Sequence, residues 1–109
     1  MPELTPQQIS LLERIRAQGF EIVAFPLYTN CVGIKKGNCA ALLASVPPNQ
    51  LRIFGAPSYL LAGNLAVRVV REGKEWFVWK ERRLEVTKER QDEIAQFSRE
   101  LSDLLQRSV

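Results

Sequence analysis

Residues 65–80 read LAVRVVREGKEWFVWK and contain the clearest structural signal in the chain. Two runs rich in valine and aromatic residues, 65–71 and 74–80, flank the dipeptide Glu72-Gly73. Such runs favour β-strands. Glycine adopts the positive φ of a two-residue hairpin turn at little cost. The stretch therefore predicts an antiparallel hairpin.

A two-residue turn fixes which residues of this hairpin face each other. The resulting pairs include Val67 with Val78 and Val69 with Trp76. Because this face is apolar, we expect it to lie in the core. The opposite face then carries Ala66, Arg68, Val70, Phe77 and Trp79. A three-residue loop would shift the register by one and change this assignment.

Shorter strand signals precede the hairpin. They cover residues 20–25, 31–35, 38–46, 51–54 and 59–61. The segments 31–35 and 38–46 are expected to pair around Lys36-Gly37, and Gly55-Ala56-Pro57 is expected to break the chain between the last two segments. The residues Ala62-Gly63-Asn64 predict a turn before the strong hairpin.

Two helices are expected, one at each end of the chain. The first spans about residues 6–18, because Thr5 and Gln8 form a capping box, Pro6 suits the first helical position and Gly19 supplies the stop. The second spans about residues 88–107, with Thr87 as N-cap. Its apolar stripe consists of Ile94, Phe97, Leu101, Leu104 and Leu105.

The order of these elements predicts an α+β fold. Hairpin connections favour a mostly antiparallel sheet of about five or six strands, flanked by an N-terminal and a C-terminal helix. The 109 residues suit one domain, and no linker divides residues 1–109.

Composition excludes several chemistries. The chain has no histidine, so nucleophilic sites that use a histidine base cannot form within it. With only Cys31 and Cys39 as thiols, we expect no metal site, and no phosphate-loop or dinucleotide pattern indicates a cofactor. We expect no catalytic residue. A small histidine-free ribonuclease that uses Tyr28, Tyr59 and arginines is a distant third hypothesis.

The two cysteines also bear on location. There is no N-terminal signal-peptide pattern and no apolar run of membrane-spanning length, so we expect a cytoplasmic protein that does not enter a membrane. A two-residue turn at Lys36-Gly37 would place Cys31 and Cys39 on opposite sides of the sheet. A three-residue loop would place both on one side, roughly 13 Å apart. Either arrangement disfavours a disulfide, and buried small side chains are expected.

The first functional hypothesis is a non-catalytic binding module. Residues 51–64 are apolar, broken by glycine and proline, and free of acidic residues. Such a segment is either buried or a surface for a protein partner, which includes a second copy in a homodimer. The residues expected to contact that partner are Ile53, Phe54, Tyr59, Leu60 and Leu61.

The alternative hypothesis is a single-stranded nucleic-acid-binding domain. The net charge is +3, and basic residues alternate with aromatic residues along the strong hairpin. Bases stack on aromatic rings, and cations bind phosphates. The residues expected to carry this function are Arg68, Arg71, Lys74, Phe77, Trp79, Lys80, Arg82 and Arg83. Burial of the aromatic rings in the sheet would leave no ring for a base to stack on and would contradict this hypothesis.

Overall fold

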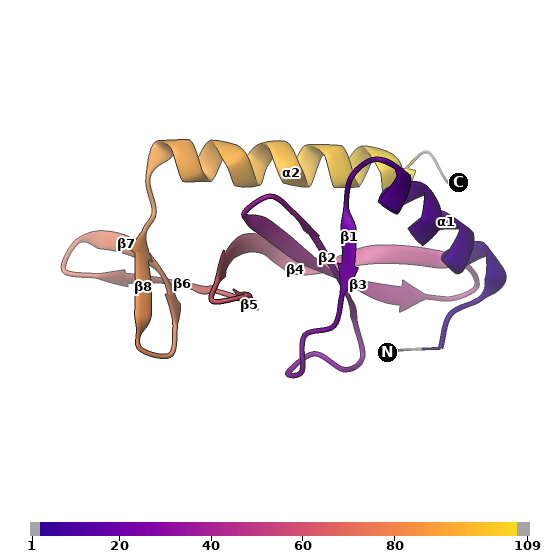
Figure 1. Cartoon of the computed structure of the whole chain (residues 1–109), viewed down its shortest axis with the longest axis horizontal. Helices are drawn as coiled ribbons and strands as arrows, with labels where there is room; N and C mark the ends of the chain where they lie inside the picture. The colour runs from indigo at the N-terminus through magenta and orange to yellow at the C-terminus, as the bar shows by residue number, and fades with distance from the viewer. Residues whose placement is uncertain (1–2, 107–109) are drawn as a thin grey trace.

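A computed structural model describes residues 3–106 of the chain. Within this range the structure has two helices and eight strands (Figure 1). The helices are α1 (Pro6–Ala17) and α2 (Lys88–Gln106). The strands are β1 (Glu21–Val23), β2 (Val32–Lys36), β3 (Cys39–Val46), β4 (Gln50–Leu61), β5 (Asn64–Leu65), β6 (Val67–Arg71), β7 (Lys74–Trp79) and β8 (Arg82–Glu85).

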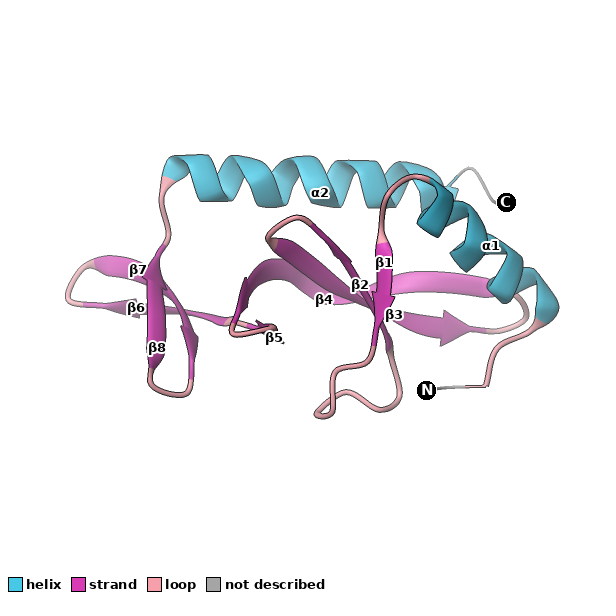
Figure 2. Cartoon of the chain, viewed as in Figure 1, coloured by secondary structure: helices cyan, strands magenta, loops and turns pink. Residues whose placement is uncertain are grey.

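The strands form two antiparallel sheets. Strands β1 to β5 make one sheet in chain order, and β6, β7 and β8 make a second (Figure 2). The predicted α+β class with a helix at each end is therefore confirmed. The prediction of a single sheet missed the division in two, and β8 was not predicted at all.

The capping box predicted for α1 is present. The Thr5 hydroxyl accepts from the Gln8 backbone N–H, and the Gln8 side chain accepts from the Thr5 N–H. The Gln8 side chain is 1% exposed, and its amide nitrogen donates to the Ser45 hydroxyl and the Gln50 carbonyl, both at 2.8 Å. This one side chain therefore caps α1 and also joins it to β3 and β4.

The N-cap of α2 is also as predicted. The Arg90 backbone N–H donates to the Thr87 hydroxyl at 3.2 Å. Phe97 and Leu101 are buried, and the other residues of the predicted stripe pack against the same core. The expected last residue, Arg107, lies outside the described residues.

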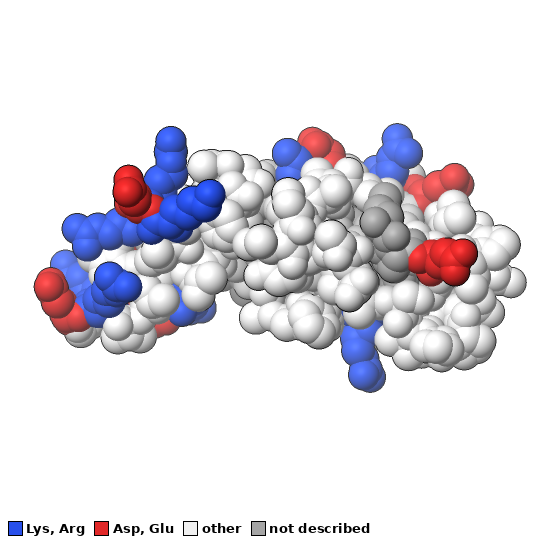
Figure 3. Space-filling model, turned by 90° about the horizontal axis from the view of Figure 1, so that it is seen from below, with Lys and Arg blue, Asp and Glu red and all other residues white. Residues whose placement is uncertain are grey.

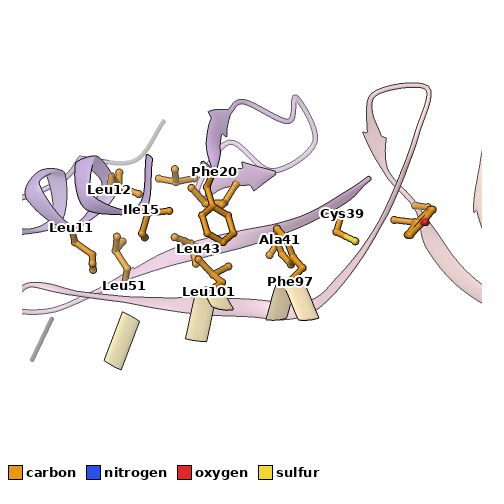
Figure 4. Packing of buried hydrophobic residues seen from close by; sticks show 14 of the residues in the cluster. Leu11, Leu12, Ile15, Phe20, Cys39, Ala41, Leu43, Leu51, Phe97 and Leu101 are labelled. Carbon is orange, nitrogen blue, oxygen red and sulfur yellow. The ribbon is translucent and has the colours of Figure 1, made fainter. Parts of the chain in front are cut away.

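Both helices cover the same face of the five-stranded sheet. Figure 4 shows side chains of α1 and α2 meeting the inward side chains of β3 between them. The buried residues of this main core include Leu11, Leu12, Ile15, Phe20, Ala41, Leu43, Phe97 and Leu101. A smaller cluster on the other face contains Phe25, Ala40, Leu42 and Leu65.

Lys36 joins the tip of the β2–β3 hairpin to both helices. Its ammonium group lies 3.0 Å from the Glu100 carboxylate of α2 and donates to the Gln18 carbonyl after α1 at 3.1 Å. It also lies 4.7 Å from the centroid of the Phe20 ring. Hydrogen bonds from Gln96 and Lys36 lower the pKa of Glu100, which keeps this carboxylate charged.

Two predictions about the middle of the chain are wrong in detail. The β2–β3 register pairs Lys36 with Cys39, so the turn is Gly37-Asn38 rather than Lys36-Gly37. Residues 51–61 form one continuous strand, because the expected break at Gly55-Ala56-Pro57 is absorbed as a bulge opposite Ala41. The positive φ of Gly55, +73°, lets the chain make this bulge without leaving the sheet.

No helix within residues 3–106 combines the length and the apolar character needed to cross a membrane.

The contacts of Gln8 lead to a stability prediction. Replacing Gln8 with Ala leaves the Thr5 N–H and the Gln50 carbonyl without their partners, and we expect it to lower the free energy of unfolding by about 2 kcal/mol. Urea unfolding followed by circular dichroism measures this change. The control is Gln7→Ala, an exposed position in the same turn, which we expect to change stability by less than about 0.5 kcal/mol. Equal effects of the two substitutions would show that the cap is unimportant.

Candidate functional site

The three-stranded sheet presents two different faces, because side chains alternate along each strand. Its register pairs Val67 with Val78 and Val69 with Trp76, which confirms the predicted pairing. One side, the Phe77 face, carries Arg68, Val70, Glu75, Phe77, Trp79, Arg82 and Leu84. The other side, the Trp76 face, carries Val67, Val69, Arg71, Lys74, Trp76, Val78, Arg83 and Glu85.

The Phe77 face packs against the rest of the protein around Phe77, whereas Arg68, Val70 and Arg82 of the same face are exposed. Phe77 is fully buried and stacks on Tyr59 of β4, with ring centroids 5.2 Å apart and an interplanar angle of 11°. The Tyr59 hydroxyl donates to the Glu93 carboxylate of α2 at 2.5 Å. These three residues connect both sheets and the long helix.

Burial also changes the acidity of Tyr59. Loss of solvent, together with the hydrogen bond and negative charge of Glu93, raises the Tyr59 pKa from 10.0 to about 12. The phenol is therefore neutral at physiological pH and serves as a hydrogen-bond donor. This role is structural, because the hydroxyl is committed to Glu93.

The Trp76 face is open, contrary to prediction. None of its residues is buried, and Val67 is 54% exposed. The prediction that this side lies in the core is wrong. Phe77, on the other side of the hairpin, is the residue that stacks on Tyr59 in the core. This side presents an apolar centre in which Val67 is exposed and Val69, Trp76 and Val78 are half-buried.

Cations border this apolar centre. The Arg83 guanidinium lies 4.6 Å from the centroid of the Trp76 ring, in a cation–π contact. Arg71 and Lys74 form the pair next to the hairpin turn and are both exposed. One carboxylate, Glu85, lies opposite Trp76 and is half-buried. The Trp76 face thus combines exposed apolar area with a net positive border.

The eight residues predicted to bind nucleic acid do not form one surface. Arg71, Lys74 and Arg83 share the Trp76 face, whereas the others lie elsewhere. Phe77 is buried and cannot offer its ring to a base, which corrects its assignment as a binding residue. Arg68 is on the Phe77 face, and its charge is paired with Glu75 at 2.6 Å.

The remaining three of these residues lie around the β7–β8 turn. Trp79 is half-buried and lines a pocket of about 260 Å³, which it shares with Lys80 and the loop of residues 25–28. The Lys80 ammonium lies 5.8 Å from the centroid of the Trp79 ring. Arg82 is exposed opposite Trp79. Trp79 is therefore only partly available to a ligand.

The predicted partner segment is also divided. Tyr59 is 6% exposed and belongs to the core, so its assignment as a partner-binding residue is corrected. Ile53 and Leu61 are half-buried against the main core, and Leu60 is half-buried against the smaller cluster. Phe54 alone among these five is exposed, at 56%, on the side of the sheet away from the helices.

The cysteines lie on opposite sides of the five-stranded sheet, the arrangement expected from a two-residue turn, although this turn is Gly37-Asn38 and not the predicted Lys36-Gly37. Both are free thiols. Burial, and to a lesser degree the charge of Glu93, raises the pKa of Cys39 from 9.0 to about 11. A thiol held in its protonated form is a poor nucleophile and a poor metal ligand. Residues 3–106 contain no group of three or more His, Cys, Asp or Glu side chains placed to hold a metal ion.

Charge is unevenly spread over the molecule. Seen from the side away from α2, Lys and Arg gather at the end formed by the three-stranded sheet, with fewer acidic residues among them (Figure 3). Sequence reasoning found these cations but missed that Trp76 and Arg83 belong together. Recognition of residues 82–85 as a third strand would have placed Arg83 on the same face as Trp76.

The raised pKa of Tyr59 predicts a pH dependence of stability. In the unfolded chain this phenol ionises near its ordinary pKa of 10.0, and in the folded protein only near about 12. Its contribution to stability is therefore complete below pH 10 and is lost as the pH rises from 10 toward 12. Urea midpoints measured from pH 9 to pH 11.5 should fall more steeply for the wild type than for Tyr59→Phe, which keeps the ring stack. Parallel curves for the two proteins would contradict this assignment.

The comparison of the chain with known proteins gives no guide to its function. No protein-family model, no curated protein and no solved structure matches it.

Proposed function

We propose that this protein is a non-catalytic binding module that uses the Trp76 face to bind another protein. The observation that carries this proposal is an apolar centre with a cationic border on an open sheet face. Protein interfaces combine an apolar core with a polar rim, and tryptophan and arginine are enriched among their strongest contacts. Trp76 supplies the aromatic residue in the centre of this face, and Arg83 supplies the arginine at its border.

The composition of the face favours a particular class of partner. Three of its four central side chains are valines, which fit apolar side chains of a protein and do not stack on bases. The cations around them complement carboxylates. We therefore expect a partner whose surface has exposed apolar side chains bordered by Asp or Glu.

The perturbed ionisable groups support a role without catalysis. Burial raises the pKa of Tyr59 and of Cys39, and hydrogen bonds from Gln96 and Lys36 lower the pKa of Glu100. Each of these groups is engaged in contacts that hold the fold together. None of the three lies on the Trp76 face, which fits the proposal that this surface binds a partner without catalysing a reaction.

Single-stranded nucleic acid is the second candidate. It is favoured by one observation, the presence of Arg71, Lys74 and Arg83 on the same face as the half-buried Trp76. With Phe77 buried, however, the platform predicted from the sequence is reduced to a single ring on this face. A base would also have to share that ring with Arg83.

The proposal predicts that Trp76→Ala and Val67→Glu weaken partner binding at least about tenfold, which corresponds to about 1.4 kcal/mol. The matched control is Leu27→Ala, which removes apolar surface at a 70% exposed position of the loop that borders Trp79, a residue of the Phe77 face and not of the Trp76 face. Immobilised wild type and variants first identify a protein that the wild type and Leu27→Ala retain and the other two lose. Titration of that purified protein by calorimetry then gives the affinities.

Two further measurements decide between the candidates. Near-ultraviolet circular dichroism shows whether each variant keeps its fold, and Val67→Glu is expected to fold because Val67 is 54% exposed. Anisotropy with labelled single-stranded RNA and DNA at low and moderate salt tests the second candidate. Saturable binding that collapses with salt and is lost in Trp76→Ala would assign the face to nucleic acid. A partner that binds the wild type, Trp76→Ala and Val67→Glu equally would refute the choice of surface.

A further inference from the structure

A pocket lies where the three-stranded sheet meets the loop between β1 and β2. Its walls come from three separate segments, which are the loop of residues 25–28, the short strand β5, and Trp79-Lys80 at the end of β7. In Figure 1 this loop and the β7–β8 turn both extend away from α2, with β5 between them. We call this hollow of about 260 Å³ the Trp79 pocket. Hollows lined by several elements are the usual sites for small molecules.

The inner wall of the Trp79 pocket is preformed. Phe25 and Leu65 line it and are only 6% and 9% exposed, because they belong to the smaller core cluster. The Phe25 ring packs so closely on β2 that a Cβ atom at Gly33 would lie 2.7 Å from its ring carbons. The Tyr28 N–H donates to the Phe25 carbonyl at 2.9 Å and closes the loop. A ligand would therefore meet an ordered surface, which lowers the entropic cost of binding.

The outer walls are apolar side chains that solvent reaches. Tyr28 and Trp79 are half-buried, and Leu27 is 70% exposed. With Phe25, three aromatic rings and a leucine border one concave space. An apolar ligand would remove this surface from water, and an aromatic ligand would add favourable ring–ring contacts. The lining thus favours an aromatic ligand.

One charged side chain belongs to the lining, and it is a cation. The Lys80 ammonium lies 5.8 Å from the centroid of the Trp79 ring. Within residues 3–106 no carboxylate forms an ion pair with Lys80, and Glu81, which shares its turn, is not part of the lining. One lysine complements the single charge of a carboxylate, whereas a phosphate monoester carries up to about two charges.

The volume of the pocket restricts the size of the ligand. Sites for drug-sized molecules occupy about 300–1,000 Å³. The Trp79 pocket is smaller, at about 260 Å³. It suits a single ring with a short side chain.

We propose that the Trp79 pocket binds a small aromatic carboxylate, in which a short chain joins one ring to the carboxylate. The ring contacts the aromatic walls, and the carboxylate pairs with Lys80. The preformed inner wall, the accessible apolar outer walls and the unpaired cation all match this one class of ligand.

This inference does not rest on the proposed partner. Trp79 lies on the Phe77 face, whereas partner binding uses the Trp76 face. Ligand binding is measured on the purified protein alone, so its failure and the failure of partner binding are separate results. Leu27→Ala, which serves as a control for partner binding, is a test variant for the pocket.

The first test asks which features of the ligand matter. Hydrocinnamate has one ring and one carboxylate, hydrocinnamamide lacks the charge, and cyclohexanepropionate lacks the aromatic ring. In titrations followed by nuclear magnetic resonance, we expect the wild type to bind hydrocinnamate with a Kd of about 1 mM or tighter. The amide should bind at least about tenfold more weakly, and cyclohexanepropionate at least about threefold more weakly.

Two results of these titrations would contradict the proposal. Absence of saturable hydrocinnamate binding by the folded wild type would overturn the site. Equal affinity for hydrocinnamate and for either analogue would overturn the class of ligand.

The second test removes parts of the pocket. Lys80→Gln, at an exposed position, should bind hydrocinnamate as weakly as the wild type binds the amide, and Leu27→Ala should bind it at least about threefold more weakly. The matched controls are Lys74→Gln, which removes an equal charge from the Trp76 face, and Ile9→Ala, which removes apolar surface from a 46% exposed position of α1. Both controls should bind like the wild type. Equal affinities of all four variants, with folds verified by circular dichroism, would refute the site.

The third test locates the ligand by fluorescence. The chain has two tryptophans, one on each face of the three-stranded sheet. In Trp76→Phe the remaining Trp79 should change its emission as hydrocinnamate saturates the protein, and in Trp79→Phe the remaining Trp76 should not respond. The reverse result would place the ligand on the Trp76 face and overturn the proposal.

Discussion

The stack of Phe77 on Tyr59 is the contact on which the arrangement of the molecule depends. Tyr59 belongs to β4, Phe77 to β7, and the hydroxyl of Tyr59 is held by Glu93 of α2. A stacked aromatic pair contributes about 1 kcal/mol beyond the area that it buries. Its larger effect here is geometric, since it fixes one face of the three-stranded sheet against the five-stranded sheet and turns the other face to solvent.

This dependence explains how far sequence reasoning could go in the hairpin. Turn length and strand alternation predicted the pairing of Val67 with Val78, because both are local properties of residues 65–80. Which face is buried does not depend on the local sequence, because both faces carry apolar side chains. The Phe77 face is the buried one because Phe77 stacks on Tyr59, which lies 18 positions earlier and on another strand. The helices were predicted well because their caps are local features. Thr5, Gln8 and Thr87 each act within one turn of helix.

The candidate surface was harder to predict than the fold, because it requires three strands. Arg83 lies beside Trp76 only through β8, a four-residue strand of mostly charged residues that carries little strand signal. The segment Gly55-Ala56-Pro57 predicted the end of a strand where the strand in fact continues. A bulge allows β4 to run past these three residues. Short strands and bulges depend on neighbours that a single segment does not reveal.

Strand β6 shows how side-chain alternation separates two roles within five residues. It sends Val67, Val69 and Arg71 to the Trp76 face, and it sends Arg68 to the opposite face, where the guanidinium pairs with Glu75. A substitution that adds charge at Val67 therefore changes the partner surface and leaves the packing of Phe77 intact. Salt that screens Arg71, Lys74 and Arg83 should weaken the attraction to an acidic partner, whereas the contacts of the valines depend little on salt.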